Sequence, residues 1–279
     1  MGNNDLDVSV VIPTFRREKE VVEAIRSAIS QADVSVEVFV LDDTPEATAR
    51  SVVNALDDAR ILYVDRVTVS NGRPALVRNE GLQRARGRYV YFLDDDDRVL
   101  PGALRALSRA LDANSTAAVA YGTVEPFGTN AKVVARYTQW FGWAARTSRH
   151  LARSSWLTVG TILFRGTLII NSACMMRREC ALALGGYDPE IPYYEDVEFH
   201  LRGMRRWGHV FVDIPVLHYR TGEPSLIHDL KGNLDPIQHS YRIMHRKYKE
   251  TYGIVDYRAL QLVSKILPLR VPAGKEILD

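Results

Sequence analysis

The feature that most constrains the fold is an apolar run, YVYFL at residues 89–93, followed directly by four aspartates at 94–97. Apolar, β-prone residues at this density predict a buried strand. Four adjacent carboxylates cannot be buried within such a strand, because an unpaired charge in a medium of low dielectric constant is too costly. The strand therefore ends where the acids begin, and the acids project either into solvent, as an acidic turn, or onto a cation.

Apolar strands and amphipathic helices alternate through the first 122 residues. Strands are predicted at 8–12, 36–41, 61–64, 89–93 and 117–121, and helices at 18–30, 44–56, 74–85 and 101–111. This alternation predicts a parallel sheet with helices on both faces, a Rossmann-like nucleotide-binding unit. Three strands end in polar or acidic residues, namely Thr14, Asp42 with Asp43, and residues 94–97. Since ligands bind at the edge where such strands end, we expect one ligand cleft there.

A second acidic element lies in the other half of the chain. Residues 195–207 have the apolar spacing of a helix that closes at Gly208, and Glu195 and Asp196 fall in its first turn. The helix dipole stabilises negative charge there, so a carboxylate stays ionised and can accept a proton. The alternative is that these acids only favour the start of the helix.

Together the two acidic elements fit a metal and a base. Clustered carboxylates at a strand end bind Mg²⁺, which typically takes one or two carboxylates together with substrate phosphates, and Mn²⁺ suits the same ligands. Such an ion stabilises a diphosphate as it leaves. Asp96 fits the metal role, and Asp196 fits that of a base that deprotonates a hydroxyl.

Bulk properties exclude several classes of protein. Lysine and arginine total 36 against 34 acidic residues, so the net charge of +2 does not indicate a nucleic-acid binder. Cys174 and Cys180 match no zinc-binding spacing. Residues 1–7 contain no apolar signal segment, and the longest apolar run, 156–170, is interrupted by Arg165 and is too short to span a bilayer. We expect a cytoplasmic protein, with peripheral association at the inner face of the membrane as an alternative.

The ordered set of motifs resembles the inverting glycosyltransferases of family 2, which have the GT-A fold. The matching segments are VVIPT at 10–14, VLDDT at 40–44, RNEG at 78–81, GRY at 87–89, FLDDDD at 92–97, GGYD at 185–188, and Glu195-Asp196 with Arg202. The resemblance covers residues 8–220. It implies an α/β, Rossmann-like GT-A fold, with a mixed, mostly parallel sheet flanked by helices.

The resemblance also implies the reaction and its partners. A sugar passes from a nucleotide-diphosphate sugar, by default a UDP-sugar because UDP is commonest in the family, to an acceptor hydroxyl with inversion. The expected context is the assembly of cell-envelope polysaccharide or glycoconjugates. The acceptor is a glycan, a lipid-linked molecule or a small molecule.

Site residues follow from the same resemblance. At the nucleotide and diphosphate it places Pro13, Thr14, Asp42, Asp43, Arg78, Asp94, Asp95 and Arg220. The outer acids of the DXD motif, Asp94 and Asp96, hold Mn²⁺ or Mg²⁺, and whether Asp95 or Asp97 joins Asp96 is left open. Asp196 is the catalytic base, and Glu195 lies beside it at the acceptor.

The implied GT-A domain spans residues 1–228, in which 1–122 bind the nucleotide sugar and 123–228 the acceptor. A helical extension follows at 229–279. The segment 136–165, rich in arginine and tryptophan, is either an amphipathic helical excursion or a region that binds the acceptor or faces a membrane. The basic tail, predicted as two helices over 239–266, is either a solvated face or a contact with an anionic surface.

Three rival functions are weighed against this prediction. A phosphohydrolase with an Asp nucleophile expects Thr or Val two residues after its second Asp, where this chain has Arg98. A nucleotidyltransferase needs a glycine-rich loop after the first strand, and PTFRR at 13–17 has no glycine. A non-catalytic module that binds nucleotide sugars or carbohydrate gives no reason to combine an acidic strand end with Glu195 and Asp196.

Overall fold

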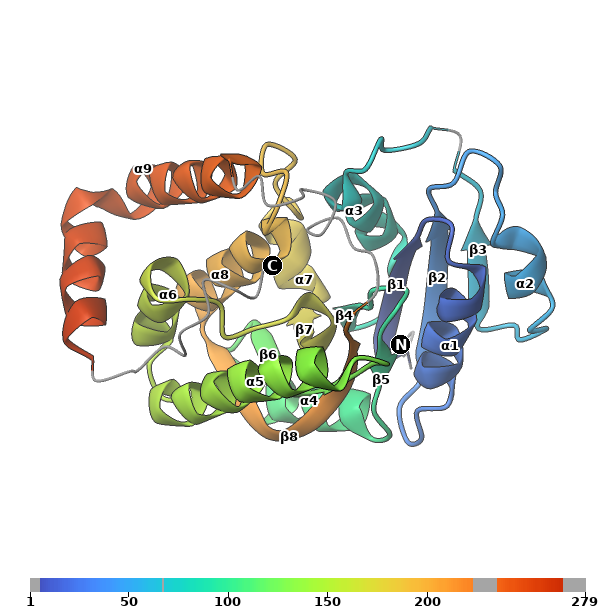
Figure 1. Cartoon of the computed structure of the whole chain (residues 1–279), viewed down its shortest axis with the longest axis horizontal. Helices are drawn as coiled ribbons and strands as arrows, with labels where there is room; N and C mark the ends of the chain where they lie inside the picture. Colours follow the sequence, from blue (N-terminus) through green and yellow to red (C-terminus); the bar gives the residue numbers. More distant parts are fainter. Residues whose placement is uncertain (1–5, 67, 223–234, 268–279) are drawn as a thin grey trace, which may run out of the picture.

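The computed structural model describes residues 6–66, 68–222 and 235–267, which contain one eight-stranded sheet (Figure 1). The strand order is β3-β2-β1-β4-β7-β6-β8-β5. The strands are β1 (Val8–Thr14), β2 (Val36–Asp42), β3 (Ile61–Val64), β4 (Tyr89–Phe92), β5 (Arg98–Val99), β6 (Val119–Phe127), β7 (Cys174–Arg177) and β8 (His209–Arg220).

The sheet is mixed and mostly parallel, which confirms the predicted fold class. Strand β1 pairs in parallel with β2 and β4, β2 with β3, and β6 with β8. Strand β7 is antiparallel to both β4 and β6, and β5 is antiparallel to β8. The first four strands thus form the Rossmann-like half, and β7 inverts the direction between the two halves.

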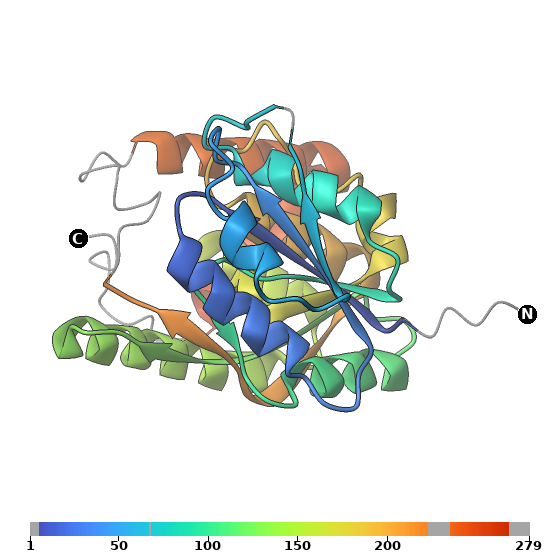
Figure 2. The ribbon, with the colours of Figure 1, turned by 90° about the vertical axis from the view of Figure 1, so that its right-hand side faces the viewer.

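Helices cover both faces of the sheet (Figure 2). They are α1 (Glu18–Ile29), α2 (Arg50–Asn54), α3 (Pro74–Arg84), α4 (Ala103–Ala113), α5 (Ala131–Leu151), α6 (Ser155–Phe164), α7 (Arg178–Ala183), α8 (Glu195–Trp207) and α9 (Asp235–Ile266), with a 3₁₀ turn at Asn171–Ala173. Successive side chains of a strand point to opposite faces, so Val10 packs with α1 and α4, while Val11 packs with α3.

Two local predictions are corrected. The helix predicted from Thr44 begins only at Arg50, because the Asp42 carboxylate accepts the backbone N–H groups of Thr44 and Ala49, both at 2.9 Å, and holds the segment as a turn. The short apolar stretches at 210–212 and 216–219 predict two strands, but they belong to one strand, β8, with irregular register against Gly122 and Thr123. The segment 136–165 forms most of α5 and α6 and is therefore helical, as the first of its two interpretations predicts.

The tail forms two helical legs, as predicted. Helix α9 begins at Asp235 rather than at 239 and breaks at Gly253, whose φ of +84° and ψ of 160° are not helical. In the part of the chain that the structure describes, no helix has both the length and the hydropathy of a membrane span.

The polar strand ends meet, as predicted. Strand β1 lies between β2 and β4, and the pairing of Thr14 with Asp42 puts both carboxyl ends at one edge. The Asp43 N–H donates to the Thr14 carbonyl at 2.9 Å. Residues 94–97 follow β4 at this same edge.

Candidate functional site

The four aspartates after β4 alternate between buried and accessible. Asp95 and Asp97 are buried, whereas the side chains of Asp94 and Asp96 keep 31% and 22% of their surface exposed. The run turns back on itself, since the Asp97 N–H donates to the Asp94 carbonyl at 3.1 Å. The two outer acids of the predicted DXD motif are therefore the pair that faces solvent.

The buried acids are held from within the chain. Thr14 Oγ1 donates to Asp95 Oδ2 at 2.7 Å, and the Arg220 N–H donates to Asp97 Oδ1 at 3.0 Å. Burial, reinforced by the charge of Asp96, raises the pKa of Asp95 to about 7. Burial, with the charges of Asp96 and Asp94, raises the pKa of Asp97 well above its usual value. Both groups therefore lie where negative charge is in excess.

Two arginines cross the acidic run. The Arg17 guanidinium contacts Asp95 at 2.9 Å and also pairs with Asp96. Arg78, which is 7% exposed, donates from Nη2 to Asp94 Oδ1 at 2.7 Å and from Nη1 to Glu195 Oε1 at 2.6 Å. Helix α3 thereby connects the end of β4 to the start of α8.

Glu195 accepts one of these two hydrogen bonds from Arg78. It is buried, and burial raises its pKa to about 7, although the charge of Arg78 opposes that shift. The structure therefore places Glu195 on Arg78, where the carboxylate holds a guanidinium in position.

Asp196, the next residue, is free of such a partner. It is half-buried, and among the described residues only backbone N–H groups, its own and that of Val197, donate to its carboxylate. Burial first, and then the charge of Asp94, raise its pKa against the opposing effect of Arg78. Desolvation thus outweighs the stabilisation expected from the helix start, and a raised pKa brings a carboxylate nearer to that of an efficient base.

A buried polar network supports these groups, and no sequence pattern marks its central residue, Asn171. Asn171 Nδ2 lies 3.4 Å from Asp94 Oδ1, while its Oδ1 accepts from Tyr187 Oη at 2.9 Å and lies 3.3 Å from His200 Nε2. Burial lowers the pKa of His200 to about 3, so the ring is neutral. The Arg78 guanidinium lies 5.5 Å from the ring centre of Tyr187. Tyr187 of the GGYD segment thus packs against the Arg78 guanidinium.

The two acids at the end of β2, Asp42 and Asp43, accept hydrogen bonds from the loops at this edge. Asp42 also accepts from Tyr63 Oη at 3.0 Å. Asp43 accepts from the Ser70 N–H at 2.7 Å and from Ser70 Oγ at 2.5 Å, and it pairs with the buried Arg66. Each has about one acceptor position left of the roughly four that a carboxylate offers. Pro13 and Thr14 end β1 beside them.

Arg220 contacts the acidic run from the end of β8. Its Nε donates to the Asp96 carbonyl at 2.9 Å and its Nη2 to Glu23 Oε2 at 2.5 Å. The end of β8 is thereby fixed to α1 as well as to the acidic turn.

Carboxylates outnumber guanidinium groups at this edge. We call Asp94, Asp95, Asp96, Asp97, Glu195 and Asp196 the acidic cluster, and Arg17, Arg78 and Arg220 are the arginines that contact it. Within the described residues, no three His, Cys, Asp or Glu side chains are grouped so as to hold a metal by themselves. Asp94 and Asp96 nevertheless fit a hard cation that completes its shell with phosphate oxygens and water, because such a site needs only one or two carboxylates.

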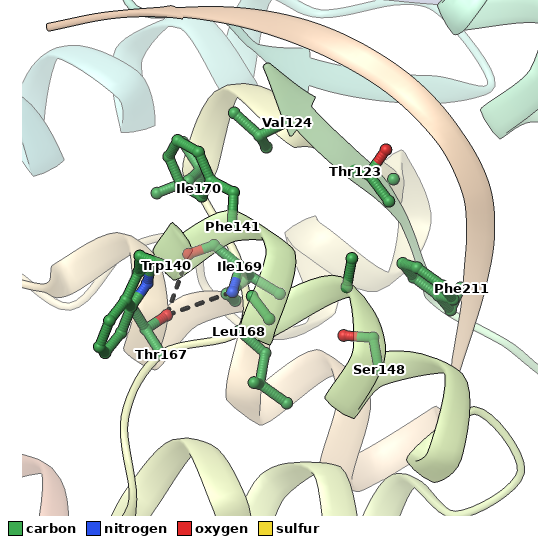
Figure 3. A pocket seen from close by; sticks show the side chains of 13 residues that line it. Thr123, Val124, Trp140, Phe141, Ser148, Thr167, Leu168, Ile169, Ile170 and Phe211 are labelled. Atoms are coloured by element: carbon green, nitrogen blue, oxygen red, sulfur yellow. Dashed lines mark hydrogen bonds between the residues drawn. The ribbon is translucent and has the colours of Figure 1, made fainter. Parts of the chain in front are cut away.

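The enclosed cavity in Figure 3 is a separate feature. It lies between α5, β6 and residues 167–170, is lined mostly by apolar side chains such as Phe141 and Leu168, and has a volume of about 10 Å³. That is room for about one water molecule, so it does not accommodate a nucleotide.

Known proteins resemble this chain in sequence and in fold. A family model described as glycosyl transferase family 2 matches residues 9–178. A Campylobacter jejuni protein named GalNAc(5)-diNAcBac-PP-undecaprenol beta-1,3-glucosyltransferase is 41% identical over 102 residues, which are 36% of this chain and 33% of that protein. The succinoglycan biosynthesis protein ExoO of Rhizobium meliloti is 38% identical over 109 residues, 38% of this chain and 30% of that protein. This chain thus matches about a third of the length of either relative.

Solved structures share the fold. The crystal structure of S. aureus TarS matches 95% of this chain and 44% of that chain, with a TM-score of 0.62 at 17% identity. A TarS structure in complex with UDP-GlcNAc matches 93% of this chain and 79% of that chain, with a TM-score of 0.57 at 17% identity.

Proposed function

This chain belongs to family 2 of the glycosyltransferases, and we propose that it transfers a sugar from a nucleoside-diphosphate sugar to an acceptor hydroxyl in one inverting displacement. The observation that carries the proposal is the double pairing of Arg78 with Asp94 and Glu195, at 2.7 and 2.6 Å. It joins the acidic strand end to the first turn of α8. A diphosphate at the strand end and a base on α8 then act on the same reacting carbon.

The donor occupies the edge formed by β1, β2 and β4. In this proposal Thr14, Asp42 and Asp43 surround the base and ribose. Their position at the ends of β1 and β2 supports this, because the crevice beyond parallel strand ends is the usual nucleotide site of such sheets. UDP is the proposed nucleotide, because one of the TarS structures that share this fold is a complex with UDP-GlcNAc. In this proposal Arg220, at the opposite side of the acidic run, lies beside the diphosphate.

A divalent cation is part of the proposal. Asp94 and Asp96 would hold Mn²⁺ or Mg²⁺, because they are the exposed members of a cluster with excess negative charge. Bound there with the donor, the ion would neutralise the diphosphate and stabilise it as the leaving group.

Asp196 serves as the general base. It accepts the proton of the acceptor hydroxyl while that oxygen bonds to the anomeric carbon, and the bond from that carbon to the diphosphate oxygen breaks on the opposite face. Its freedom from side-chain donors among the described residues, together with its raised pKa, suits this role. Glu195 acts on the same step indirectly, by holding Arg78 in place.

The acceptor is proposed to be a glycan or a lipid-linked saccharide. The Campylobacter relative's name specifies an undecaprenyl-diphosphate-linked acceptor, and the Rhizobium relative is named for polysaccharide biosynthesis. Cell-envelope polysaccharide or glycoconjugate assembly is the context that follows.

The experiment measures both transfer and binding for Asp196→Asn and for a control, Asp213→Asn. Asp213 is exposed on β8, where it pairs with Arg149, and its substitution should leave both measurements unchanged. UDP affinity is measured by calorimetry with Mn²⁺, and transfer or donor hydrolysis is measured across a panel of nucleotide sugars. We expect Asp196→Asn to reduce turnover about 10²–10⁴-fold with UDP affinity nearly unchanged. Lost UDP affinity in that variant would contradict the role as base, and the absence of binding by any nucleoside diphosphate would refute the transferase proposal.

A further inference from the structure

The second leg of α9, residues 254–266, carries most of the large hydrophobic side chains that are exposed in the described part of the chain. Six large hydrophobic side chains are exposed in the described part of the chain, and four of them lie on this leg: Ile254 (54%), Val255 (81%), Leu262 (60%) and Ile266 (70%). Figure 1 shows the leg at the left edge of the molecule, with no other described element beyond it. Among the described elements, none therefore covers its outer face.

The exposed residues form a single stripe. With about 100° of rotation per residue, the four aliphatic side chains and the exposed Arg258 and Lys265 all fall within an arc of roughly 120°. No acidic residue lies on this arc. The one acid of the leg, Asp256, faces inward, where it accepts from Trp156 Nε1 at 2.9 Å and Tyr248 Oη at 2.6 Å.

The stripe is rigidly attached to the domain. Asp256 also contacts Arg205 of α8 at 3.1 Å, and Leu260 packs so closely on α6 that a Cβ at Gly160 would lie 2.7 Å from its Cδ2. At the other end of α9, Ser240 Oγ accepts from the Tyr193 N–H at 3.2 Å, two residues before Glu195. The second leg thus contacts α8, which bears Asp196, through Arg205, and the first leg contacts the residues just before α8.

We propose that this stripe docks on the surface of an anionic lipid bilayer, with α9 residues 254–266 lying in the plane of the interface. Aliphatic side chains enter the boundary of the acyl chains, while the Arg258 and Lys265 side chains extend to lipid phosphates. Acidic residues are absent from the arc, so an anionic surface meets no repulsion there. The Asp196 carboxylate is then held at a fixed height above the bilayer.

The charges argue against a second copy of this chain as the occupant. In a two-fold contact through the stripe, the cations of one copy would face those of the other, with no acid on the arc to pair with them. A bilayer supplies both the apolar layer and the phosphates that such a mixed stripe needs.

The test measures partition of the full chain onto vesicles by co-sedimentation, without nucleotide, so that it does not depend on the donor or on turnover. Vesicles of phosphatidylcholine alone are compared with vesicles that contain about 30% phosphatidylglycerol, at low and at high salt. We expect binding to the anionic vesicles that weakens with salt. Arg258→Gln with Lys265→Gln should weaken it about 25-fold, since each cation contributes about fivefold at such a surface.

Matched controls remove the same groups from other faces. Lys19→Gln with Arg109→Gln deletes two exposed cations from α1 and α4 and should leave partition unchanged. Val255→Ser with Leu262→Ser should weaken partition, whereas Ile214→Ser, which removes an exposed isoleucine of β8, should not. No binding of the folded chain to anionic vesicles at low salt would overturn the proposal. So would a dimer in solution that the stripe variants dissociate while vesicle binding is absent.

Discussion

Replacing Arg78 with methionine tests whether this one side chain unites the two halves of the site. The guanidinium is 7% exposed and makes charge-assisted hydrogen bonds of 2.7 Å to Asp94 and 2.6 Å to Glu195. Methionine occupies a similar volume but leaves both carboxylates without their cation. Removing one partner of a buried ion pair costs about 3–5 kcal/mol, so we expect the free energy of unfolding to fall by about that amount at pH 8.

The pH dependence of this loss distinguishes charge from packing. Arg78 holds the pKa of Glu195 down against burial, so without it that pKa rises further above its usual value. A carboxyl with a higher pKa in the folded than in the unfolded chain takes up a proton preferentially on folding. The stability lost at pH 8 is therefore regained as the pH falls below the pKa of Glu195 in the folded chain. A loss of stability caused by a packing defect would instead be independent of pH.

Urea unfolding at pH 8 and at pH 6 is the assay, with two further variants. Arg84→Met removes an exposed pair with Glu80 from the same helix, at 3.1 Å, and should cost at most about 0.5 kcal/mol. Adding Glu195→Gln to Arg78→Met should recover part of the loss, because an amide needs no cation. If Arg78→Met cost no more than Arg84→Met, or if its cost were the same at both pH values, the reasoning about this ion pair would be refuted.

Three further predictions concern the same edge of the sheet. Gly186→Ala should lower the free energy of unfolding by about 2–3 kcal/mol in thermal or urea unfolding, because a Cβ there would lie 2.2 Å from Asn79 Oδ1 at a φ of +78°. Gly185→Ala should cost about half as much, because that residue has a similar φ but no atom within 4 Å of the added Cβ. The native chain should lose stability as the pH rises from about 4 through 7, since the pKa of Asp95 is raised to about 7, and Asp95→Asn should flatten that profile in urea titrations. Asp96→Ala should weaken UDP binding in Mn²⁺ at least tenfold by calorimetry, and equal affinity with and without Mn²⁺ in the native chain would contradict the metal proposal.

Backbone-level features of this site were predictable, because they follow from local patterns. The apolar run before residues 94–97 predicts where β4 ends, and the alternation of strands and helices predicts that Thr14 and Asp42 lie at the same edge. Likewise, the spacing of apolar residues predicts that α8 begins at Glu195. Each of these depends on residues that are neighbours in sequence.

The partners of the acids were not predictable in the same way. Arg17 and Asn171 meet the acidic run from 77 or more residues away, and no periodicity marks either of them. The sequence places Glu195 and Asp196 side by side as candidate catalytic acids, and only the tertiary contact of Arg78 separates their environments. The start of α2 was missed for a related reason, since Asp42 competes for the N–H groups that a helix at Thr44 would need.

The charge balance is a physical argument for the proposed cation at this edge. The acidic cluster exceeds the arginines that contact it, and the raised pKa values of Asp95, Asp97 and Glu195 share burial and like charge among their causes. A diphosphate bound alone would add negative charge to this excess, and Arg17 and Arg78 are already paired with carboxylates. A divalent ion at Asp94 and Asp96 has the opposite effect, because it lowers the repulsion among the carboxylates and also attracts the phosphates. In the proposed function, relief of the repulsion among these acids therefore contributes to the affinity for the donor and its metal together.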